Sequence, residues 1–542
     1  MQRERPKQPS RRTKPPWEAH TAGALYCVRK STPASGSSGA GYNARYPRWL
    51  VGRPLLWMTS LFGSLGDALF GFDQGIMAGL LVNSTWIKRF LATKGGADGT
   101  TDGVDPSLTG IIVACLQVAA AVAALFSGAL ADKVGRKRCV RAGGFLYLVT
   151  AIMQCLAPSL GVFIAGRTLQ GFAVGMLSMT VPIIQAEIAR PHRRGLLVGV
   201  QYTLLIGSFM LSCWINYGAY FLIPNDESWR VPFYVQMFLA SILVFMSFYL
   251  PETPRWLARY GFMAECEQTL ADLHGAGNID DADVQLVLTE IKQAAAYESS
   301  LEKVTWGEMF GRYRKRTIMA ITAQMFAQLN GINVISFYLP STLSRAGYTT
   351  DEALLYTAAN AVIYTASTIP TWWLADRWGR KPLLIYGGCL MAIFLAMMCV
   401  FTEAKTFSLQ SQAHGIFAFV VLYNAAYGGT WGPMPWLLPA EIFPMRARSI
   451  GVALSTCSNW TFNFIIGMSS PDAFDGLGGY YYVIILGFCL FSVGLVKLYY
   501  VETSKHTLEE LAIAFGDRAF EDDDDAVMSS AGRPGTGGEM HI

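Results

Sequence analysis

Long apolar segments that hold almost no charge alternate with short polar loops over most of the chain. Each segment is about 20 residues long, which is enough for a helix to cross the roughly 30 Å hydrocarbon core of a bilayer. The approximate limits of the twelve segments are 57–82, 108–131, 140–157, 160–189, 195–222, 230–250, 317–346, 353–375, 382–402, 413–440, 447–470 and 481–501. The pattern therefore predicts an all-α membrane protein with twelve transmembrane helices.

The longest hydrophilic interruption, 251–316, separates the sixth segment from the seventh. Within it, residues 263–274 and 282–297 have helical character, so we expect a linker of short amphipathic helices. The expected regions are a tail at 1–50, a six-helix half at 51–250, the linker at 251–316, a second six-helix half at 317–501 and a tail at 502–542.

Residues 1–50 are rich in Arg, Pro and Ser, and their only acids are Glu4 and Glu18. No apolar stretch precedes a cleavage site, which argues against a secretory signal peptide. The composition favours a disordered cytosolic tail. A mitochondrial presequence and an over-extended gene model are the alternatives.

Three short motifs recur in the second half of the chain, each about 250 residues after its first occurrence. The pairs are Asp132-Lys-Val-Gly-Arg-Lys and Asp376-Arg-Trp-Gly-Arg-Lys, Glu187-Ile and Glu441-Ile, and Pro-Glu252-Thr and Val-Glu502-Thr. Three unrelated motifs at nearly one offset indicate two homologous halves in parallel orientation. In such proteins the substrate site lies between the halves, near the bilayer midplane.

Basic residues are distributed unevenly between the loops. The loops after the odd-numbered segments contain only six of the 43 Lys and Arg residues, and the alternate loops carry basic clusters. Because basic residues collect on the cytoplasmic side, both termini and the linker are predicted to be cytoplasmic. Asn83, in an Asn-Ser-Thr sequon, then lies outside, where it is either glycosylated or unused.

Composition excludes several other classes of protein. Only 15% of the residues are charged, against about 25% in an ordinary soluble protein. A net charge of +4 is too small to suggest nucleic acid as a partner. The ten cysteines are scattered without a Cys-x-x-Cys pair, so we interpret them as core residues rather than a metal or disulfide framework. No nucleophile constellation or phosphate loop indicates an enzyme, and no cofactor is expected.

Several polar residues lie where a membrane helix should be apolar. Asp73 and Arg167 fall inside apolar segments, where an ionised side chain normally pairs or faces water. Asn459 and Asn463 share one helix face by their spacing, as do Gln324 and Gln328. Other breaks in the apolar pattern are Gly331, which permits a helix break near Asn333, and Gly432-Pro433 with Pro435, which precede Trp436.

Together these motifs resemble the sugar porter family of the major facilitator superfamily, over roughly residues 57–510, and fungal members in particular. The matching strings are Phe-Gly-Phe-Asp73-Gln-Gly, Gly128…Asp132…Gly135-Arg136-Lys137, Gly166-Arg167, Pro251-Glu252-Thr253-Pro254-Arg255-Trp256-Leu257, Gly331-Ile-Asn333, Trp431-Gly432-Pro433-Met-Pro435-Trp436 and Val501-Glu502-Thr503.

The resemblance implies transport of a sugar or related polyol by alternating access, as a proton symporter and monomer in the plasma membrane. The alternatives are a facilitative uniporter and a non-transporting nutrient sensor with the same fold. Nutrient sensors resemble transporters in fold but usually carry a long cytoplasmic signalling tail. Only about 40 residues follow the last apolar segment here, which argues against a sensor.

The resemblance also assigns roles to the charged residues. Asp73 is implied as the proton site and Arg167 as its partner; a static ion pair is the alternative, and Asp67 is a competitor nearer the cytoplasmic end. The residues implied in a cytoplasmic gate are Asp132, Arg136, Glu187, Arg194, Glu252, Arg255, Asp376, Arg380, Glu441, Arg448 and Glu502. Positive-inside residues without a gating role would explain the bases, but not the repeated acids.

A third implied set is the sugar site. Its residues are Gln201, Tyr202, Gln324, Gln328, Asn333, Tyr364, Trp436, Asn459 and Asn463. Three positions depart from the family pattern: Ala327 stands where a Gln is usual, Tyr364 where an Asn is usual, and Tyr202 where a Gln is usual, with Gln201 beside it. These departures leave a disaccharide, polyol, pentose or sugar acid open as the substrate.

Overall fold

The computed structural model describes residues 46–99, 104–190, 194–223, 225, 227–300, 304–345, 347–404, 408–504 and 515. Most of the predicted tails at 1–50 and 502–542 therefore lies outside the described residues. The regular structure in the described part of the chain is helical, which confirms the all-α class. Each of the twelve predicted apolar segments contains helix.

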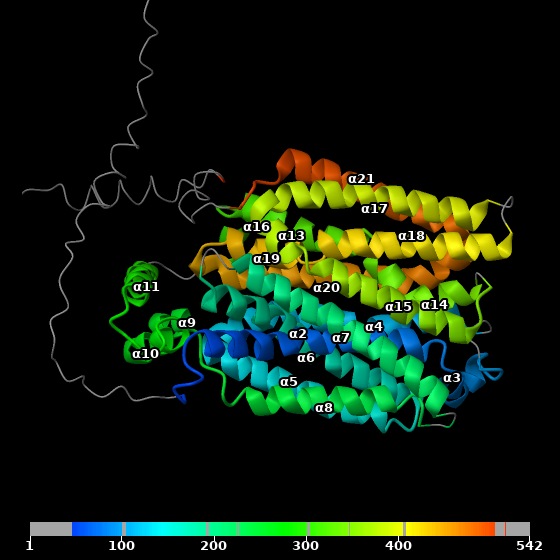
Figure 1. The fold of residues 1–542 in the computed structure, drawn as a ribbon, viewed down its shortest axis with the longest axis horizontal. Helices are drawn as coiled ribbons and strands as arrows, with labels where there is room; N and C mark the ends of the chain where they lie inside the picture. The colour runs from blue at the N-terminus through cyan, green and yellow to red at the C-terminus, as the bar shows by residue number, and fades with distance from the viewer. Residues whose placement is uncertain are drawn as a thin grey trace, which may run out of the picture. The chain divides into compact units, whose positions relative to one another are not determined.

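Six long helices form the first half of the chain, coloured blue to green in Figure 1. They are α2 (Arg53–Leu80), α4 (Pro106–Val134), α5 (Arg136–Cys155), α6 (Leu160–Ile188), α7 (Arg194–Leu222) and α8 (Val231–Met246). The short helix α3 (Ser84–Leu91) and the 3-10 turn η1 (Ala92–Lys94) follow α2 and were not predicted. Asn83 caps α3 by accepting hydrogen bonds from the backbone N–H groups of Thr85 and Trp86.

The second half repeats this arrangement with more interruptions. Its helices are α13 (Arg314–Leu329), α14 (Ile332–Arg345), α15 (Thr350–Thr368), α16 (Thr371–Trp378), α17 (Arg380–Glu403), α18 (Leu409–Gly429), α19 (Met434–Ile442), α20 (Met445–Leu477) and α21 (Tyr481–Tyr499), with the 3-10 turn η3 (Gly478–Tyr480) before α21. By length and composition, seven stretches of the described chain are long and apolar enough to cross a membrane. The pairs α13–α14 and α20–α21 each fall within one such stretch.

Two interruptions place polar residues at mid-helix. Gly331 has a φ of 98° between α13 and α14, and a Cβ there would lie 2.6 Å from the Ile485 side chain, so only glycine fits. The second interruption separates α18 from α19 at 430–433, at the predicted Gly-Pro sequence. A broken helix exposes backbone groups inside the bundle, where they line a cavity or find partners.

Glycines bring helices within each half into close contact. On α2, Gly71, Gly75 and Gly79 recur every fourth residue and face α7. A Cβ on Gly71 would lie 2.0 Å from the carbonyl oxygen of Leu205. This small-residue stripe lets the two backbones approach closely, as in other membrane helix pairs.

The closest contacts between the halves involve α4 and α7. Helix α4 packs along α20, and α7 packs along α15 and α16. A Cβ on Gly128 would lie 2.9 Å from the carbonyl of Ser449, and one on Gly110 would lie 2.7 Å from that of Met468. Because these glycines lie near opposite ends of α4, the two halves are in contact over most of its length.

The linker contains four helices, two of which were predicted. They are α9 (Pro254–Arg259), α10 (Met263–His274), α11 (Ala282–Ser300) and α12 (Trp306–Phe310). The backbone N–H of Gly52, just before α2, donates to the carbonyl of Asp272 on α10 at 2.6 Å. Helices α9–α11 therefore lie at the end of the bundle where α2 begins, which we call the linker end (Figure 1).

Acidification is expected to loosen the contact between α10 and the bundle. His274 lines a cavity of about 170 Å³ with Arg53 and Arg190, and burial, with the nearby charge of Arg190, lowers its pKa from 6.5 to about 4. A detached imidazole would bind a proton that the docked one does not, so docking loses stability as the pH falls from 6.5 towards 4.

Hydrogen–deuterium exchange of α10, corrected for the intrinsic pH dependence, is expected to be several-fold faster at about pH 5 than at about pH 7. The His274→Gln variant serves as the control, because its neutral amide cannot titrate. An equal acceleration in the variant would show that another group controls the docking.

Candidate functional site

An ion pair lies buried among the helices of the first half. Arg167 on α6 donates to both carboxylate oxygens of Asp73 on α2, at 3.3 Å each, and its Nε donates to the carbonyl of Ile112 at 3.0 Å. Both side chains are at most 2% exposed. The sequence thus correctly predicted that these two residues form a pair.

Two further residues complete this site and were missed by the sequence analysis. Gln236 on α8 directs its amide nitrogen at Asp73, at 3.4 Å, and donates to the hydroxyl of Tyr147 at 2.6 Å. Tyr147 donates in turn to the carbonyl of Leu69. The only available signal was that Gln236 is the one amide in the otherwise apolar α8.

A first group of amides joins α13, α19 and α20. Asn459 donates to the amide oxygen of Gln324 at 2.5 Å, and Gln324 donates to the backbone carbonyl of Pro435 at 2.9 Å. Pro435 precedes the half-buried Trp436. Asn463, one turn beyond Asn459, is buried, and its amide oxygen accepts no hydrogen bond in the described part of the chain.

A second group of amides connects the two halves across the break in α13–α14. Asn333 on α14 donates to Gln328 on α13. Gln74 on α2, one residue after Asp73, donates to the amide oxygen of Asn333 at 3.0 Å. This hydrogen bond joins the first half to the second directly beside the Asp73–Arg167 pair.

Tyrosines rather than amides occupy two of the three positions that depart from the family pattern. The hydroxyls of Tyr202 on α7 and Tyr364 on α15 lie 2.9 Å apart, so they form another hydrogen bond between the halves. Tyr364 packs against Tyr427 on α18, whose hydroxyl donates to the carbonyl of Ala327. A Cβ on Gly432 would lie 2.5 Å from the ring of Tyr202.

Gln201 points elsewhere than its neighbour Tyr202. Its amide nitrogen donates to the carboxylate of Asp67 on α2, within the first half. Gln201 is therefore joined to Asp67 and belongs to neither of the two amide groups. The sequence did not predict this pairing, because the family resemblance assigns Gln201 to the sugar site and makes Asp67 a competitor of Asp73.

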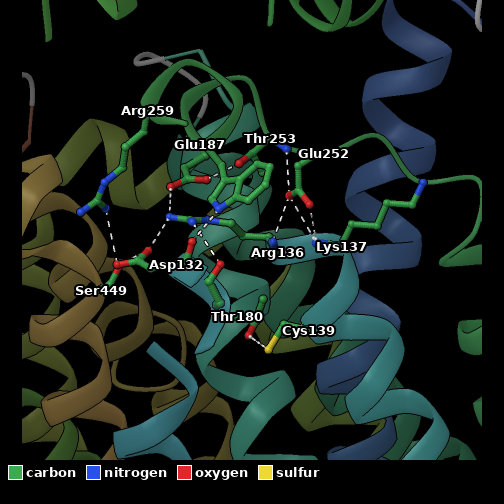
Figure 2. A network of polar contacts seen from close by, with 12 residues as sticks. Asp132, Arg136, Lys137, Cys139, Thr180, Glu187, Glu252, Thr253, Arg259 and Ser449 are labelled. Carbon is green, nitrogen blue, oxygen red and sulfur yellow. Dashed lines mark hydrogen bonds and ion pairs between the residues drawn. The ribbon is translucent and has the colours of Figure 1, made fainter. Parts of the chain in front are cut away.

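At the linker end, the acids and bases of the first repeat form one network (Figure 2). Arg136 donates to Glu187 at 3.0 Å and lies 3.1 Å from Asp132. Glu252 accepts hydrogen bonds from the backbone N–H groups of Arg136 and Lys137, so it caps the start of α5. Burial raises the pKa of Glu252 above its ordinary value, and hydrogen bonds from the backbone N–H groups of Thr253 and Lys137 partly offset this rise.

The network of the second half reproduces the main contacts of the first. Arg380 donates to Glu441 at 2.8 Å and lies 3.0 Å from Asp376. Glu502 accepts from the backbone N–H groups of Arg380 and Lys381, at 2.9 Å each, and caps α17. The repeated sequence motifs thus correspond to repeated polar networks.

Each network also reaches the opposite half. The hydroxyl of Ser449, in the second turn of α20, donates to Asp132 at 2.8 Å. The carboxylate of Asp376 lies 2.8 Å from where a Cβ on Gly195 would be, at the start of α7. Each acid therefore faces the N-terminal end of a helix in the other half, where the helix dipole favours negative charge.

Two of the three remaining bases of the predicted gate lie in this region. Arg448 on α20 and Arg255 on α9 border the same small cavity as Arg136 and Glu187, and both contribute positive potential at Glu187. The side chain of Arg194 lies outside the described residues. The networks therefore contain ten of the eleven predicted gate residues within the described side chains.

Comparisons with known proteins agree with this architecture. A family model described as "Sugar (and other) transporter" matches residues 59–515. A probable glucose transporter of Neurospora crassa is 31% identical over 471 residues, covering 84% of this chain and 78% of the relative. A high-affinity glucose transporter of Kluyveromyces lactis is 29% identical over 479 residues, covering 84% of each chain.

Solved structures share the fold. A proton:xylose symporter of the major facilitator superfamily, bound to 6-bromo-6-deoxy-D-glucose, matches with a TM-score of 0.74 at 24% identity, covering 85% of this chain and 98% of the symporter. An inward-open structure of the same transporter from E. coli matches with a TM-score of 0.66 at 22% identity, covering 85% of this chain and 99% of that one.

Proposed function

This chain belongs to the sugar (and other) transporter family, and from that premise we propose that it moves a sugar or related polyol across a membrane by alternating access. The single observation that carries this proposal is the hydrogen bond between Gln74 and Asn333. It joins amides of both halves deep in the bundle, where a solute with several hydroxyl groups could replace amide–amide bonds with its own.

We place the substrate between α2, α13, α14, α19 and α20. The proposed contacts come from the two amide groups and from residues beside them, which are Gln324, Gln328, Asn333, Trp436, Asn459 and Asn463. Amides supply donors and acceptors for hydroxyls, and the Trp436 ring supplies an apolar face. Tyr202 on α7 and Tyr364 on α15 lie at the edge of this region and would restrict the shape of the solute.

Proton coupling is proposed to act through Asp73. The ion pair with Arg167 stabilises the ionised carboxylate in the closed arrangement, and a proton on Asp73 would weaken it. Gln74 follows Asp73 on α2 and donates to Asn333. A shift of α2 at the ion pair would therefore change the hydrogen bond between Gln74 and Asn333. The relatives' printed names include glucose transporters, and the solved relative is a proton:xylose symporter, which supports this reading.

We further propose that the linker end faces the cytoplasm and that the protein resides in the plasma membrane as a monomer. The excess of basic residues in the loops at that end supports the orientation. The networks at the linker end would then form the cytoplasmic gate. The hydrogen bond from Ser449 to Asp132 of the other half would hold such a gate closed.

Purified protein in proteoliposomes, loaded with one unlabelled sugar or polyol at a time, tests the transport proposal. Counterflow of the matching labelled solute is expected for at least one member of a panel of hexoses, pentoses, disaccharides, sugar acids and polyols. Binding of a solute without counterflow of any panel member would contradict the proposal and favour a nutrient sensor.

Replacing Gln328 with leucine is expected to raise the substrate KM roughly tenfold, because a lost amide contact is worth about 1–1.5 kcal/mol. Gln328 is buried and bonded to Asn333, beside the break in α13–α14. Uptake kinetics on the best solute of the panel measure the effect.

Gln117→Leu is the matched control, since the buried Gln117 amide donates to the carbonyls of Val113 and Ala114 on its own helix. Its KM should stay close to that of the wild type. An unchanged KM in the Gln328 variant would remove this residue from the proposed substrate site.

A further inference from the structure

A second acid lies buried on α2, apart from the ion pair with Arg167. Asp67 is 4% exposed and lies one turn before Gly71, on the stripe of α2 that packs against α7. Its Oδ2 accepts a hydrogen bond from the amide nitrogen of Gln201 on α7. Beside it, a Cβ on Gly66 would meet the apolar side chains of Val181 and Leu177 on α6.

No cation balances this carboxyl group within the described residues. The helices packed against α2 are α5, α6, α7, α8, α10 and α14. Their charged and titratable side chains include Arg136 and Tyr147 on α5, Arg167 and Glu187 on α6, Tyr202 on α7, Asp272 and His274 on α10 and Tyr338 on α14. The two arginines and Glu187 are engaged with other partners, and none of the set forms an ion pair with Asp67. From α8, the neutral Gln236 reaches Asp73 on α2.

Two acceptors in this pair lack donors. Oδ1 of Asp67 and Oε1 of Gln201 are both buried, and neither takes part in a hydrogen bond in the described part of the chain. An ionised carboxylate and an amide oxygen both only accept, so they cannot satisfy each other. A proton on Oδ1 changes this, because the carboxylic acid can then donate to Oε1 while Oδ2 still accepts from the amide nitrogen.

Ionisation without a partner would be expensive at this depth. An unpaired charge is strongly disfavoured near the centre of a membrane protein, whereas a neutral acid that both donates to and accepts from the amide leaves no polar atom without a partner. Asp73 differs in this respect, because Arg167 compensates its charge. The two acids of α2 therefore have opposite requirements, although they lie less than two turns apart.

We propose that Asp67 and Gln201 form a second proton-binding site of this transporter, and that Asp67 holds the proton in the conformation described here. Each planar group donates once and accepts once across the α2–α7 contact. Loss of the proton breaks the reciprocal bond and leaves a buried charge, so transport weakens as the pH rises through the ionisation of Asp67. Only this effect on transport rests on the proposed function; proton binding itself does not.

Infrared spectroscopy of the membrane-reconstituted protein detects the proton directly. The wild type is expected to show the C=O stretching band of a protonated, hydrogen-bonded carboxyl group at neutral pH. The band should disappear in Asp67→Asn and persist in Asp73→Asn. In Gln201→Leu it should remain but move to the higher frequency of a carboxyl group without an amide partner. A difference spectrum between wild type and Asp67→Asn without this band would overturn the proposal.

Transport supplies a second, separate readout. Asp67→Asn is permanently neutral, so its counterflow rate should lack the decline at alkaline pH that the wild type shows. An identical alkaline decline in the variant would contradict a role for this proton in transport. If the infrared band is assigned to Asp67 but the wild type never accumulates solute under a proton gradient, the proposed coupling fails while the proton-binding site stands.

Discussion

Asp73→Asn is expected to abolish accumulation of solute driven by an inward proton gradient, while solute counterflow survives. Asparagine has the shape of a protonated aspartate but can neither release a proton nor form the ion pair with Arg167, whose hydrogen bonds to Asp73 measure 3.3 Å. The variant therefore keeps the state that binds solute and loses the step that links it to the proton. The measurement is uptake into proteoliposomes with and without the gradient, alongside counterflow without one.

Asp283→Asn is the matched control for this variant. Asp283 also pairs with an arginine, Arg190, but its side chain is 68% exposed and lies in the linker, where an ion pair is worth little. Its accumulation should equal that of the wild type. Accumulation that persists in Asp73→Asn would remove Asp73 from the coupling mechanism and leave its pair with Arg167 a structural one.

Neutralising Asp132 and Asp376, the two acids that contact the opposite half, is expected to open the linker end. In Asp132→Asn with Asp376→Asn, the contacts to the starts of α20 and α7 lose their charge. Each contact of this kind is typically worth about 0.3–1 kcal/mol, so losing the charge in both should raise the population open at the linker end roughly tenfold. The pairs Arg136–Glu187 and Arg380–Glu441 remain, which preserves each half.

Alkylation of a cysteine placed between the halves measures this opening. Ala453 on α20 is 1% exposed and packs against Gly128 of α4, so Ala453→Cys becomes accessible only when the two helices separate. Labelling is compared with the same protein lacking this substitution, which corrects for native cysteines. Ala453→Cys is made in the wild type, in the Asp132→Asn, Asp376→Asn double variant and in Asp283→Asn. Labelling of the introduced cysteine that is faster in the double variant alone supports the gate. Equal labelling rates in all three proteins would show that the two acids do not hold the gate closed.

The sequence predicted those features that depend on local pattern. Apolar segments defined the spanning helices, and Gly331 marked the break that the structure shows, with a φ of 98°. The repeated Gly-Arg-Lys strings predicted matching networks because both copies adopt the same local geometry. Gly135 and Gly379 both have positive φ. A glutamate caps the helix that follows each of these glycines.

Partnerships between helices could not be predicted in the same way. Whether Gln201 faces the centre of the bundle or Asp67 depends on how α7 is rotated against α2, and the glycine stripe sets that rotation through close backbone contact. Likewise, Tyr147 and Gln236 join the Asp73 site only because α5 and α8 converge there. Spacing along one helix fixes a shared face but does not say which neighbour that face meets.

Accumulation by the wild type under an imposed proton gradient tests the central claim most directly. Proteoliposomes containing the purified protein are given the labelled sugar or polyol that shows counterflow, with and without an inward proton gradient. The account predicts that the gradient drives this solute inside above its external concentration and that a protonophore abolishes the excess. Uptake that only equilibrates, whatever the gradient, would contradict proton-coupled transport and identify the protein as a uniporter.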